Sequence, residues 1–270
     1  PPGAVRAGNR RRSVDVKEGV LVPASYRLTD LALPYLLDTD DVSLSAKGLY
    51  QLVCHHRPNS IAQLALASGL SRETVRRECM VLKDKGWLKL EVVKARRTII
   101  VPTAPDKLQK KLANALTKWR HLWFRVGESL MKVLLDNTVA SYEYFDNCRP
   151  SDIANPKTGH RLEFDRLYYP DVAFEFQGPQ HRQRTSLHQS EKEFMDAQER
   201  DLVKAALASK SGIQVVEIVA TDLTIDGILA KIPDGMPLVR IDRGCKFIRQ
   251  LNQTGYGFIA YCKRKSQERK

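Results

Sequence analysis

Two carboxylates in the C-terminal half of the chain, Asp165 and Glu175, are placed where they could hold a divalent metal ion. They lie in two short apolar runs, residues 161–165 and 172–177, on either side of a turn at residues 168–171. Two such runs around a turn predict a β-hairpin, which can bring both carboxylates together. Oxygen ligands of this kind bind Mg²⁺, which polarises a phosphoryl group and lowers the pKa of a bound water. The pair therefore indicates hydrolysis of phosphodiester bonds.

The alternation along the second run favours a ligand role for Glu175. It stands between two phenylalanines, so on a strand its side chain lies on the opposite face from theirs, beside Gln177. Two structural interpretations remain open, because Glu175 could protect a sheet edge and Asp165 could simply begin a turn. Asp171, which follows the proline of the turn, is a rival for the aspartate role.

The N-terminal half contains the signals of three short helices. A first helix is expected over residues 45–53 with a serine cap, and a second runs from Ser60 to Gly69, where glycine can take the positive φ of a tight turn. Ser71 opens a third helix with a capping-box-like start, and residues 85–86 end it.

The third helix has one apolar and one basic side. Val75, Met80 and Leu82 are expected to face inward, whereas three arginines can reach a phosphate or a base edge: Arg72, Arg76 and Arg77. Two strand-like runs follow, residues 87–93 and 98–101. A basic tip joins them, with the cations Lys94, Arg96 and Arg97.

Residues 44–102 resemble the winged helix-turn-helix domains of bacterial regulators and of plasmid or phage replication proteins. The motif LASGLSRETVRRECMVLKDKGWL carries the resemblance. It implies that the helix from Arg72 enters the major groove of double-stranded DNA while the basic hairpin contacts the backbone. The alternative is a winged helix that binds protein, with the arginines as a solvated face.

The C-terminal half resembles the PD-(D/E)xK, or restriction-endonuclease-like, nuclease superfamily over residues 126–223. The stretch RPSDIANPKTGHRLEFDRLYYPDVAFEFQGPQH carries the resemblance. By this match Asp165 takes the place of the first aspartate of the motif, Glu175 the acidic position and Gln177 the lysine position. Glu128 resembles the metal-binding glutamate of the first helix, and Lys204 falls in a Q..RD..K pattern on the helix that follows.

The chain departs from the commonest form of the superfamily at Gln177. A lysine there would be cationic, whereas an amide can hydrogen-bond the attacking water but brings no charge. The nearer relatives within the resemblance also have glutamine here, so the site is not interpreted as inactive. Lys204 is the candidate for the missing charge, and Lys204 or His181 could steady the charge of the phosphate.

The composition fits a nucleic-acid partner. The 270 residues include 44 Lys and Arg against 31 Asp and Glu, a net charge of +13, which favours a polyanion. The five cysteines lie far apart without a zinc spacing, which indicates reduced thiols and a cytoplasmic protein. No apolar run approaches the length of a membrane span, and the N-terminus lacks the apolar core of a signal peptide.

The expected fold is therefore α/β, with a winged helix followed by a restriction-endonuclease-like domain around a central mixed sheet. The expected parts are a flexible basic arm over residues 1–30, a winged helix over 31–105, and a nuclease domain with its connecting helix over 106–270. The connecting helix is predicted to begin at Asp106 and to continue past Gly127. The sequence predicts a Mg²⁺-dependent DNA endonuclease in a bacterial, phage or plasmid setting, with Mn²⁺ as the alternative metal. A homodimer would supply the two active sites that cutting both strands requires. The alternatives are a non-catalytic DNA-binding regulator or replication factor with a degenerate nuclease fold, and an RNA-directed nuclease.

Overall fold

The computed structural model describes residues 16–17, 20–21, 23, 25–58, 60–93, 97–121, 125–178 and 191–268. They divide into two compact units. The helical unit contains the described residues from 16 to 121 together with 239–253. The sheet unit contains the described residues from 125 to 238 together with 254–268.

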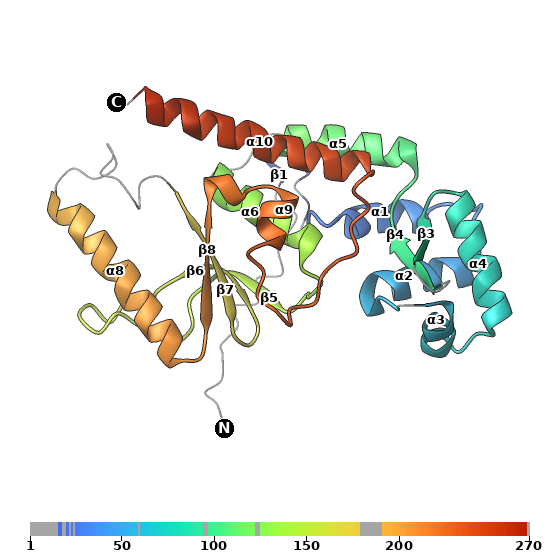
Figure 1. Ribbon diagram of the computed structural model, residues 1–270, viewed down its shortest axis with the longest axis horizontal. Coiled ribbons are helices and arrows are strands. Elements are labelled where there is room, and N and C mark those ends of the chain that lie inside the picture. Colours follow the sequence, from blue (N-terminus) through green and yellow to red (C-terminus); the bar gives the residue numbers. More distant parts are fainter. Residues whose placement is uncertain are drawn as a thin grey trace. The chain divides into compact units, whose positions relative to one another are not determined.

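The helical unit is built from short helices and a β-hairpin (Figure 1). After the two-residue strands β1 (Val16–Lys17) and β2 (Val20–Leu21), its elements are α1 (Leu28–Leu37), α2 (Leu44–His56), α3 (Ile61–Ser68), α4 (Arg72–Asp84), β3 (Leu88–Val93), β4 (Arg97–Pro102) and α5 (Asp106–Arg120). The predicted starts of α3 and α4 are confirmed, and at each of them a serine, Ser60 or Ser71, accepts a backbone N–H of the first turn. Gly69 ends α3 at a φ of 69°, in the left-handed region that glycine favours.

Three details of these helices differ from the sequence-based expectation. The cap of α2 is Ser43, which accepts the backbone N–H of Ala46, so the helix starts before Ser45. In α4 the buried row contains Cys79, while Met80 is 40% exposed, because the spacing from Val75 that returns to the same helix face is four residues. Helix α1 was not predicted; it contains Pro34, a residue type that usually interrupts a helix.

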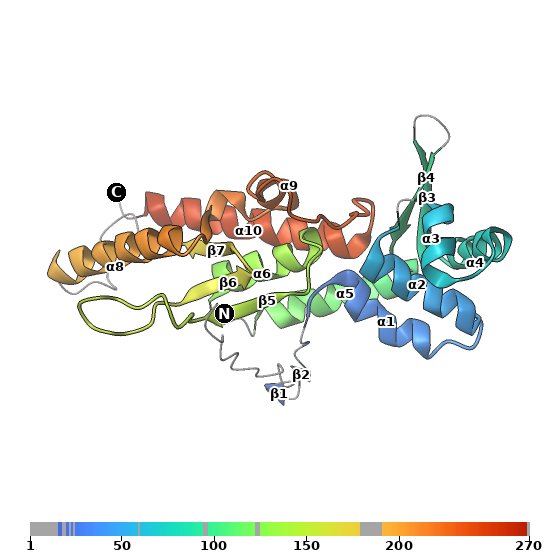
Figure 2. The ribbon, with the colours of Figure 1, turned by 90° about the horizontal axis from the view of Figure 1, so that it is seen from below.

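Strands β3 and β4 form an antiparallel hairpin in which Leu88 pairs with Pro102 and Val93 with Arg97. The two strands run side by side and away from α2 and α3 (Figure 2). The strand pair expected after the third helix is therefore confirmed. The tip residues Lys94 and Arg96 lie outside the described residues.

Two expected boundaries in the N-terminal half need correction. The arm was expected to reach residue 30, but Tyr26, Arg27 and Leu28 are buried, and the Tyr26 ring packs edge-on against Trp119 at 5.4 Å. The helix expected to continue past Gly127 is instead two helices, α5 and α6 (Val126–Thr138). Apolar residues recur at helical spacing in both α5 and α6, so this spacing alone did not reveal that the helix is interrupted between them.

The sheet unit is organised around four strands: β5 (Tyr144–Cys148), β6 (Phe164–Tyr168), β7 (Val172–Gln177) and β8 (Gln214–Val219). They are ordered β5-β6-β7-β8, antiparallel except for the parallel pair β7 and β8. Helix α8 (Glu191–Lys210) lies on one face, and α6 with α9 (Ile225–Leu229) lies on the other (Figure 1). The predicted α/β class and central mixed sheet are thus confirmed. The first strand of the hairpin is shifted relative to the expected 161–165, so Asp165 lies near the start of β6 rather than at its end.

A buried arginine fastens α6 to the sheet. Arg166 on β6 is fully buried and donates to Asp136 of α6 at 2.7 Å and to Asp146 of β5 at 2.7 Å. It also donates to the carbonyl oxygen of Lys132 at 3.1 Å, and its guanidinium lies 4.0 Å from the centre of the Tyr144 ring. A buried charge is tolerated only when it is paired and hydrogen-bonded, which holds here. These bonds fix the position of α6 relative to β6.

Residues 239–253 differ from the expected domain boundary, because they pack with the helical unit. Asp242 is buried and accepts from Lys89 at 2.7 Å and from Thr103 at 3.0 Å. Arg240 donates to the carbonyl oxygen of Ile100 at 3.2 Å. The long helix α10 (Lys246–Gln267) begins in this segment and ends in the sheet unit. Within the described part of the chain, no helix combines the length and apolarity required to cross a membrane.

Candidate active site

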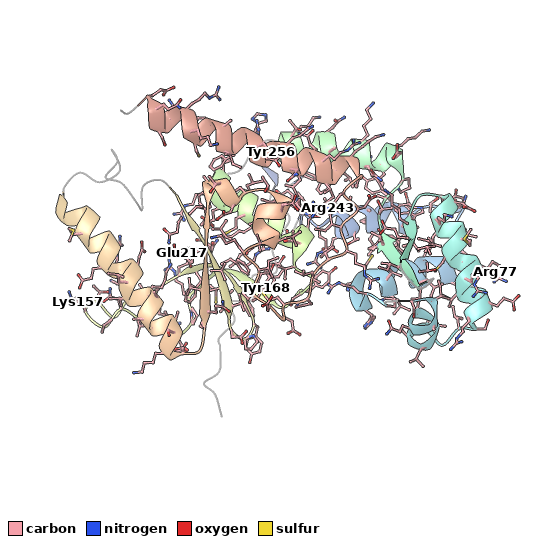
Figure 3. The ribbon with its side chains drawn as sticks, in the orientation of Figure 1. Arg77, Lys157, Tyr168, Glu217, Arg243 and Tyr256 are labelled. Atoms are coloured by element: carbon pink, nitrogen blue, oxygen red, sulfur yellow. The ribbon has the colours of Figure 1, made fainter. Side chains whose placement is uncertain are left out.

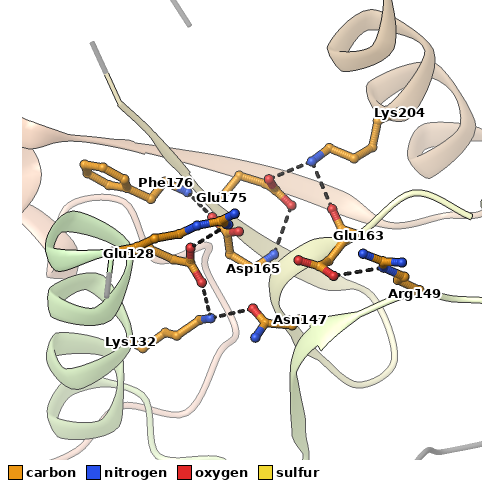
Figure 4. Close-up of polar contacts among 10 residues, drawn as sticks. Glu128, Lys132, Asn147, Arg149, Glu163, Asp165, Glu175, Phe176 and Lys204 are labelled. Atoms are coloured by element: carbon orange, nitrogen blue, oxygen red, sulfur yellow. Dashed lines mark hydrogen bonds and ion pairs between the residues drawn. The ribbon is translucent and has the colours of Figure 1, made fainter. Parts of the chain in front are cut away.

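Asp165 and Glu175 lie across from each other on adjacent antiparallel strands (Figure 4). The register pairs Arg166 with Phe174, which sets Asp165 opposite Glu175 on one face of the hairpin. The backbone N–H of Asp165 donates to Glu175 Oε1 at 3.2 Å, and the backbone N–H of Phe176 donates to Asp165 Oδ2 at 2.8 Å. The predicted meeting of the two carboxylates is therefore confirmed.

Lys204 of α8 joins this pair from the helix that packs on the sheet. Its Nζ donates to Glu175 Oε2 at 2.7 Å and to the carbonyl oxygen of Glu163 at 3.1 Å. The Lys204 side chain is 16% exposed and that of Glu175 is 8% exposed, so the ion pair is largely shielded from water. The cation proposed from sequence to compensate for Gln177 is thus in contact with the acidic position.

Glu128 and Lys132 contribute a second ion pair from α6. They are four residues apart on one helix face, and Lys132 Nζ donates to Glu128 Oε1 at 2.5 Å. The same Nζ donates to Asn147 Oδ1 of β5 at 2.8 Å, and Arg125 donates to Glu128 Oε2 at 3.3 Å. Figure 4 shows the Glu128 carboxylate directed toward Asp165 and Glu175. The cluster therefore holds three carboxylates, the buried Lys132 and the partly buried Lys204.

Burial dominates the electrostatics of the cluster. It raises the pKa of Glu175 to about 7, with the Asp165 charge adding to the rise and Lys204 opposing it. Burial and then the Glu128 charge raise the pKa of Asp165. Burial lowers the pKa of Lys132, although Glu128 and Asp165 favour its charged form. The negative charges are thus costly to keep in this site without a compensating cation.

The chemistry of the donor set fits a hard divalent cation. Mg²⁺ in proteins is bound through one or two carboxylates and completes its shell with water and phosphate oxygens. Asp165 and Glu175 could supply those two carboxylates, with Glu128 nearby. Among the described residues, however, no three acidic, histidine or cysteine side chains converge into a metal-binding group. Instead, Lys132 pairs with Glu128 and Lys204 pairs with Glu175.

The other residues considered for the site are placed less closely. Gln177 lies on β7 two residues beyond Glu175 and so on the same face, half-buried, and its amide has no hydrogen bond to any described residue. Asp171 is exposed at the hairpin turn, at the opposite end of the β6–β7 ladder from Glu175, so it is not part of this cluster. His181 lies outside the described residues.

In the helical unit, the predicted DNA-contacting arginines of α4 lie on its exposed side. Arg72, Arg76 and Arg77 are all exposed, opposite the buried row of Val75, Cys79 and Leu82. The Arg77 side chain is 68% exposed and pairs at 3.1 Å with the buried Glu78, and Figure 3 shows it on the outer side of α4. Lys94 and Arg96 lie outside the described residues, and Arg97 is described only through its backbone in β4.

Lys132 and Asn147 are site residues that the sequence reasoning missed. The signal for Lys132 was present, because it lies one helical turn after Glu128 and is the only charged residue within the apolar run of residues 130–135. Asn147 had no local signal. It lies at a φ of 51° in β5, and only the sheet pairing brings it to α6.

Comparisons with known proteins give one partial relative and no family. No family model matches the chain, and no solved structure matches it. "Uncharacterized protein 094L" of Frog virus 3 (isolate Goorha) is 37% identical over 92 residues. The match covers 33% of this chain and 59% of that protein, so the chain spans a little over half of the relative's length. The name of that protein states no activity.

Proposed function

We propose that this protein is a Mg²⁺-dependent endonuclease acting on double-stranded DNA, with catalysis in the sheet unit and DNA binding in the helical unit. The observation that carries the proposal is the cluster of Asp165, Glu175 and Lys204 on one face of a mixed sheet, with Glu128 adjacent. Its order along the chain agrees with the resemblance to the PD-(D/E)xK nucleases. In this proposal the helical unit is a winged helix.

Each side chain has a role that follows from its position. Asp165 and Glu175 are the metal ligands, and Glu128 is a third. Bound Mg²⁺ would polarise the phosphoryl group and lower the pKa of a water molecule. Gln177, on the same face of β7 as Glu175, orients that water by hydrogen bonding through its amide. Lys204 supplies the positive charge that a lysine at position 177 would bring, and its bond to Glu175 keeps it beside the reacting phosphate.

DNA binding is proposed to rest on α4 and on the β3–β4 hairpin. The three exposed arginines of α4 support this role, because they occupy the helix side away from the core. A helix of this kind can enter the major groove of a duplex, which RNA helices keep too narrow for side chains to read. The net charge of +13 supports a polyanionic substrate. Cleavage of both strands would need two active sites, so a homodimer is a corollary to be tested.

Two observations favour a second function, that of a DNA-binding regulator with a degenerate nuclease fold. Gln177 brings no charge, and Lys132 and Lys204 pair with two of the three candidate carboxylates in the described part of the chain. We favour the enzyme, because a relic would have no reason to retain Asp165 and Glu175, two carboxylates whose ionised forms burial disfavours.

The decisive experiment is a plasmid assay. Purified protein is incubated with supercoiled plasmid and with Mg²⁺, Mn²⁺ or EDTA, and the nicked and linear forms are quantified. The proposal expects nicking or linearisation with metal and none with EDTA. Duplex binding without cleavage under every metal, including on DNA selected for binding, would favour the regulator. A matched structured RNA tests whether cleavage is restricted to DNA.

A further inference from the structure

The ion pair between Lys132 and Glu128 deepens the proposed function, on which this inference rests. Both side chains are only 11% exposed, so each is largely withdrawn from water. A buried carboxylate is stable when a cation replaces that water. Lys132 supplies the cation, because its ammonium group donates to Glu128 Oε1 at 2.5 Å.

The position of Lys132 is fixed from two sides. One bond goes to Glu128 Oε1 on its own helix and one goes to Asn147 Oδ1 on β5, at 2.8 Å. The carbonyl oxygen of Lys132 accepts from the buried Arg166 at 3.1 Å, which holds this turn of α6 on the sheet. Lys132 can therefore lose Glu128 as a partner and still keep Asn147.

The two lysines of the cluster are not equivalent. Lys204 binds Glu175 Oε2 while also donating to a backbone carbonyl, and it approaches from α8. Lys132, in contrast, donates to Glu128, the carboxylate proposed as the third metal ligand. A divalent ion bound by Glu128 would lie near the ammonium group that donates to Oε1 at 2.5 Å, and two cations this close repel each other, so each would weaken the hold of the other on this carboxylate.

We propose that Lys132 is an internal competitor of the divalent metal ion for Glu128. In the metal-free protein the ammonium group of Lys132 neutralises Glu128. If Glu128 served as a metal ligand, Lys132 would leave its carboxylate and would be retained by Asn147. Lys132 thus lowers the affinity of the site for the metal ion, and it neutralises the Glu128 charge when no metal ion is bound.

The test is a titration with Mn²⁺ in which the free ion is measured by electron paramagnetic resonance. It compares wild type with Lys132→Met, and with Lys132→Arg as the variant that keeps the charge. Removal of the competitor should tighten Mn²⁺ binding by about tenfold, within the roughly 5–150-fold range of coupled sites. Lys132→Arg should bind Mn²⁺ much as wild type does. Circular dichroism establishes that each variant is folded, and Lys132→Gln replaces Lys132→Met if that variant is not.

Loss of any nearby positive charge would also tighten metal binding, so a double-mutant cycle is needed. In a Glu128→Gln background, Lys132→Met should give no gain, because there is no carboxylate left to compete for. An equal gain in that background, or no gain in the native one, overturns the inference. Both results leave the nuclease proposal standing if wild type binds Mn²⁺ and cleaves. Absence of Mn²⁺ binding in wild type and every variant overturns the metal-dependent function itself.

Discussion

Asp165 and Glu175 face each other across the β6–β7 ladder, and the backbone N–H of Asp165 donates to Glu175 Oε1 at 3.2 Å. Each carboxylate therefore uses one oxygen to accept a backbone N–H of the hairpin, since Asp165 Oδ2 accepts from Phe176. These bonds fix the direction of both side chains before any ligand is present.

Replacing either carboxylate should remove metal-dependent cleavage. Asp165→Ala and Glu175→Ala are expected to be inactive in the plasmid assay, because each lacks a proposed metal ligand, while duplex affinity stays within a few-fold. Asp171→Ala is the matched control, since that residue is exposed at the far end of the hairpin and should cleave as wild type does. A Glu175→Ala preparation with full nicking activity would contradict the site, and inactivity of Asp171→Ala alone would move the aspartate role.

Gln177 should matter for rate but tolerate a lysine. Gln177→Ala is expected to slow single-turnover cleavage of a labelled duplex by about 10²–10⁴, the range for loss of one positioned proton-handling group. Gln177→Lys should keep measurable activity, because the nucleases that this chain resembles place lysine at the matching position. If Gln177→Ala leaves the rate unchanged, Gln177 has no part in the mechanism, although the enzyme assignment survives.

The arginines of α4 should carry part of the salt dependence of DNA binding. Replacing Arg72, Arg76 and Arg77 with alanine should weaken duplex binding and make the slope of log affinity against log salt shallower, by about 0.9 for each phosphate that the protein no longer neutralises. The control variant replaces three exposed lysines of the sheet unit with alanine: Lys157, Lys210 and Lys231. It removes the same charge and should change the slope little. Unchanged affinity and slope in the arginine variant would favour a protein-binding role for this helix.

The raised pKa of Glu175 predicts a pH-dependent stability difference in the metal-free protein. Burial raises this pKa to about 7 from the usual 4.5, so the folded chain binds the proton more tightly than the unfolded chain does. That contribution is present below about pH 4.5 and is lost as the pH rises toward about 7. In EDTA, the Tm of Glu175→Gln relative to wild type should therefore increase over this interval and then level off. A Tm difference that is constant with pH would show that Glu175 titrates normally.

Two glycines of α10 should respond in opposite directions to alanine. A Cβ at Gly255 would lie 1.8 Å from the carbonyl oxygen of Leu223, whereas a Cβ at Gly257 would have no atom within 4 Å. Gly255→Ala should therefore destabilise the protein by at least about 1–3 kcal/mol, as overpacking does. Gly257→Ala should be neutral or stabilising by up to about 1 kcal/mol, because alanine favours a helix over glycine. Denaturant unfolding of both variants measures the difference in the free energy of unfolding. Equal stabilities would contradict the close approach of Gly255 to Leu223.

Local patterns in the sequence were enough for much of the candidate site and its supports. The serines at the starts of α3 and α4 and Gly69 at the end of α3 act within a few residues, so their signals can be read directly from the chain. The same holds for Glu175 and Gln177, whose shared face follows from the alternation of side chains along any strand. The pairing of Asp165 with Glu175 required only a short hairpin.

Contacts between residues distant in the sequence were decided by the tertiary structure. Lys204 reaches Glu175 only because α8 packs on the sheet, and Asn147 reaches Lys132 only because β5 pairs with β6. Asp242 joins the helical unit through Lys89, 153 residues away in the sequence. Helical and strand periods specify which face of an element is buried but not which other element covers it. That choice depends on how the whole chain packs, and it is what places two lysines among the three carboxylates.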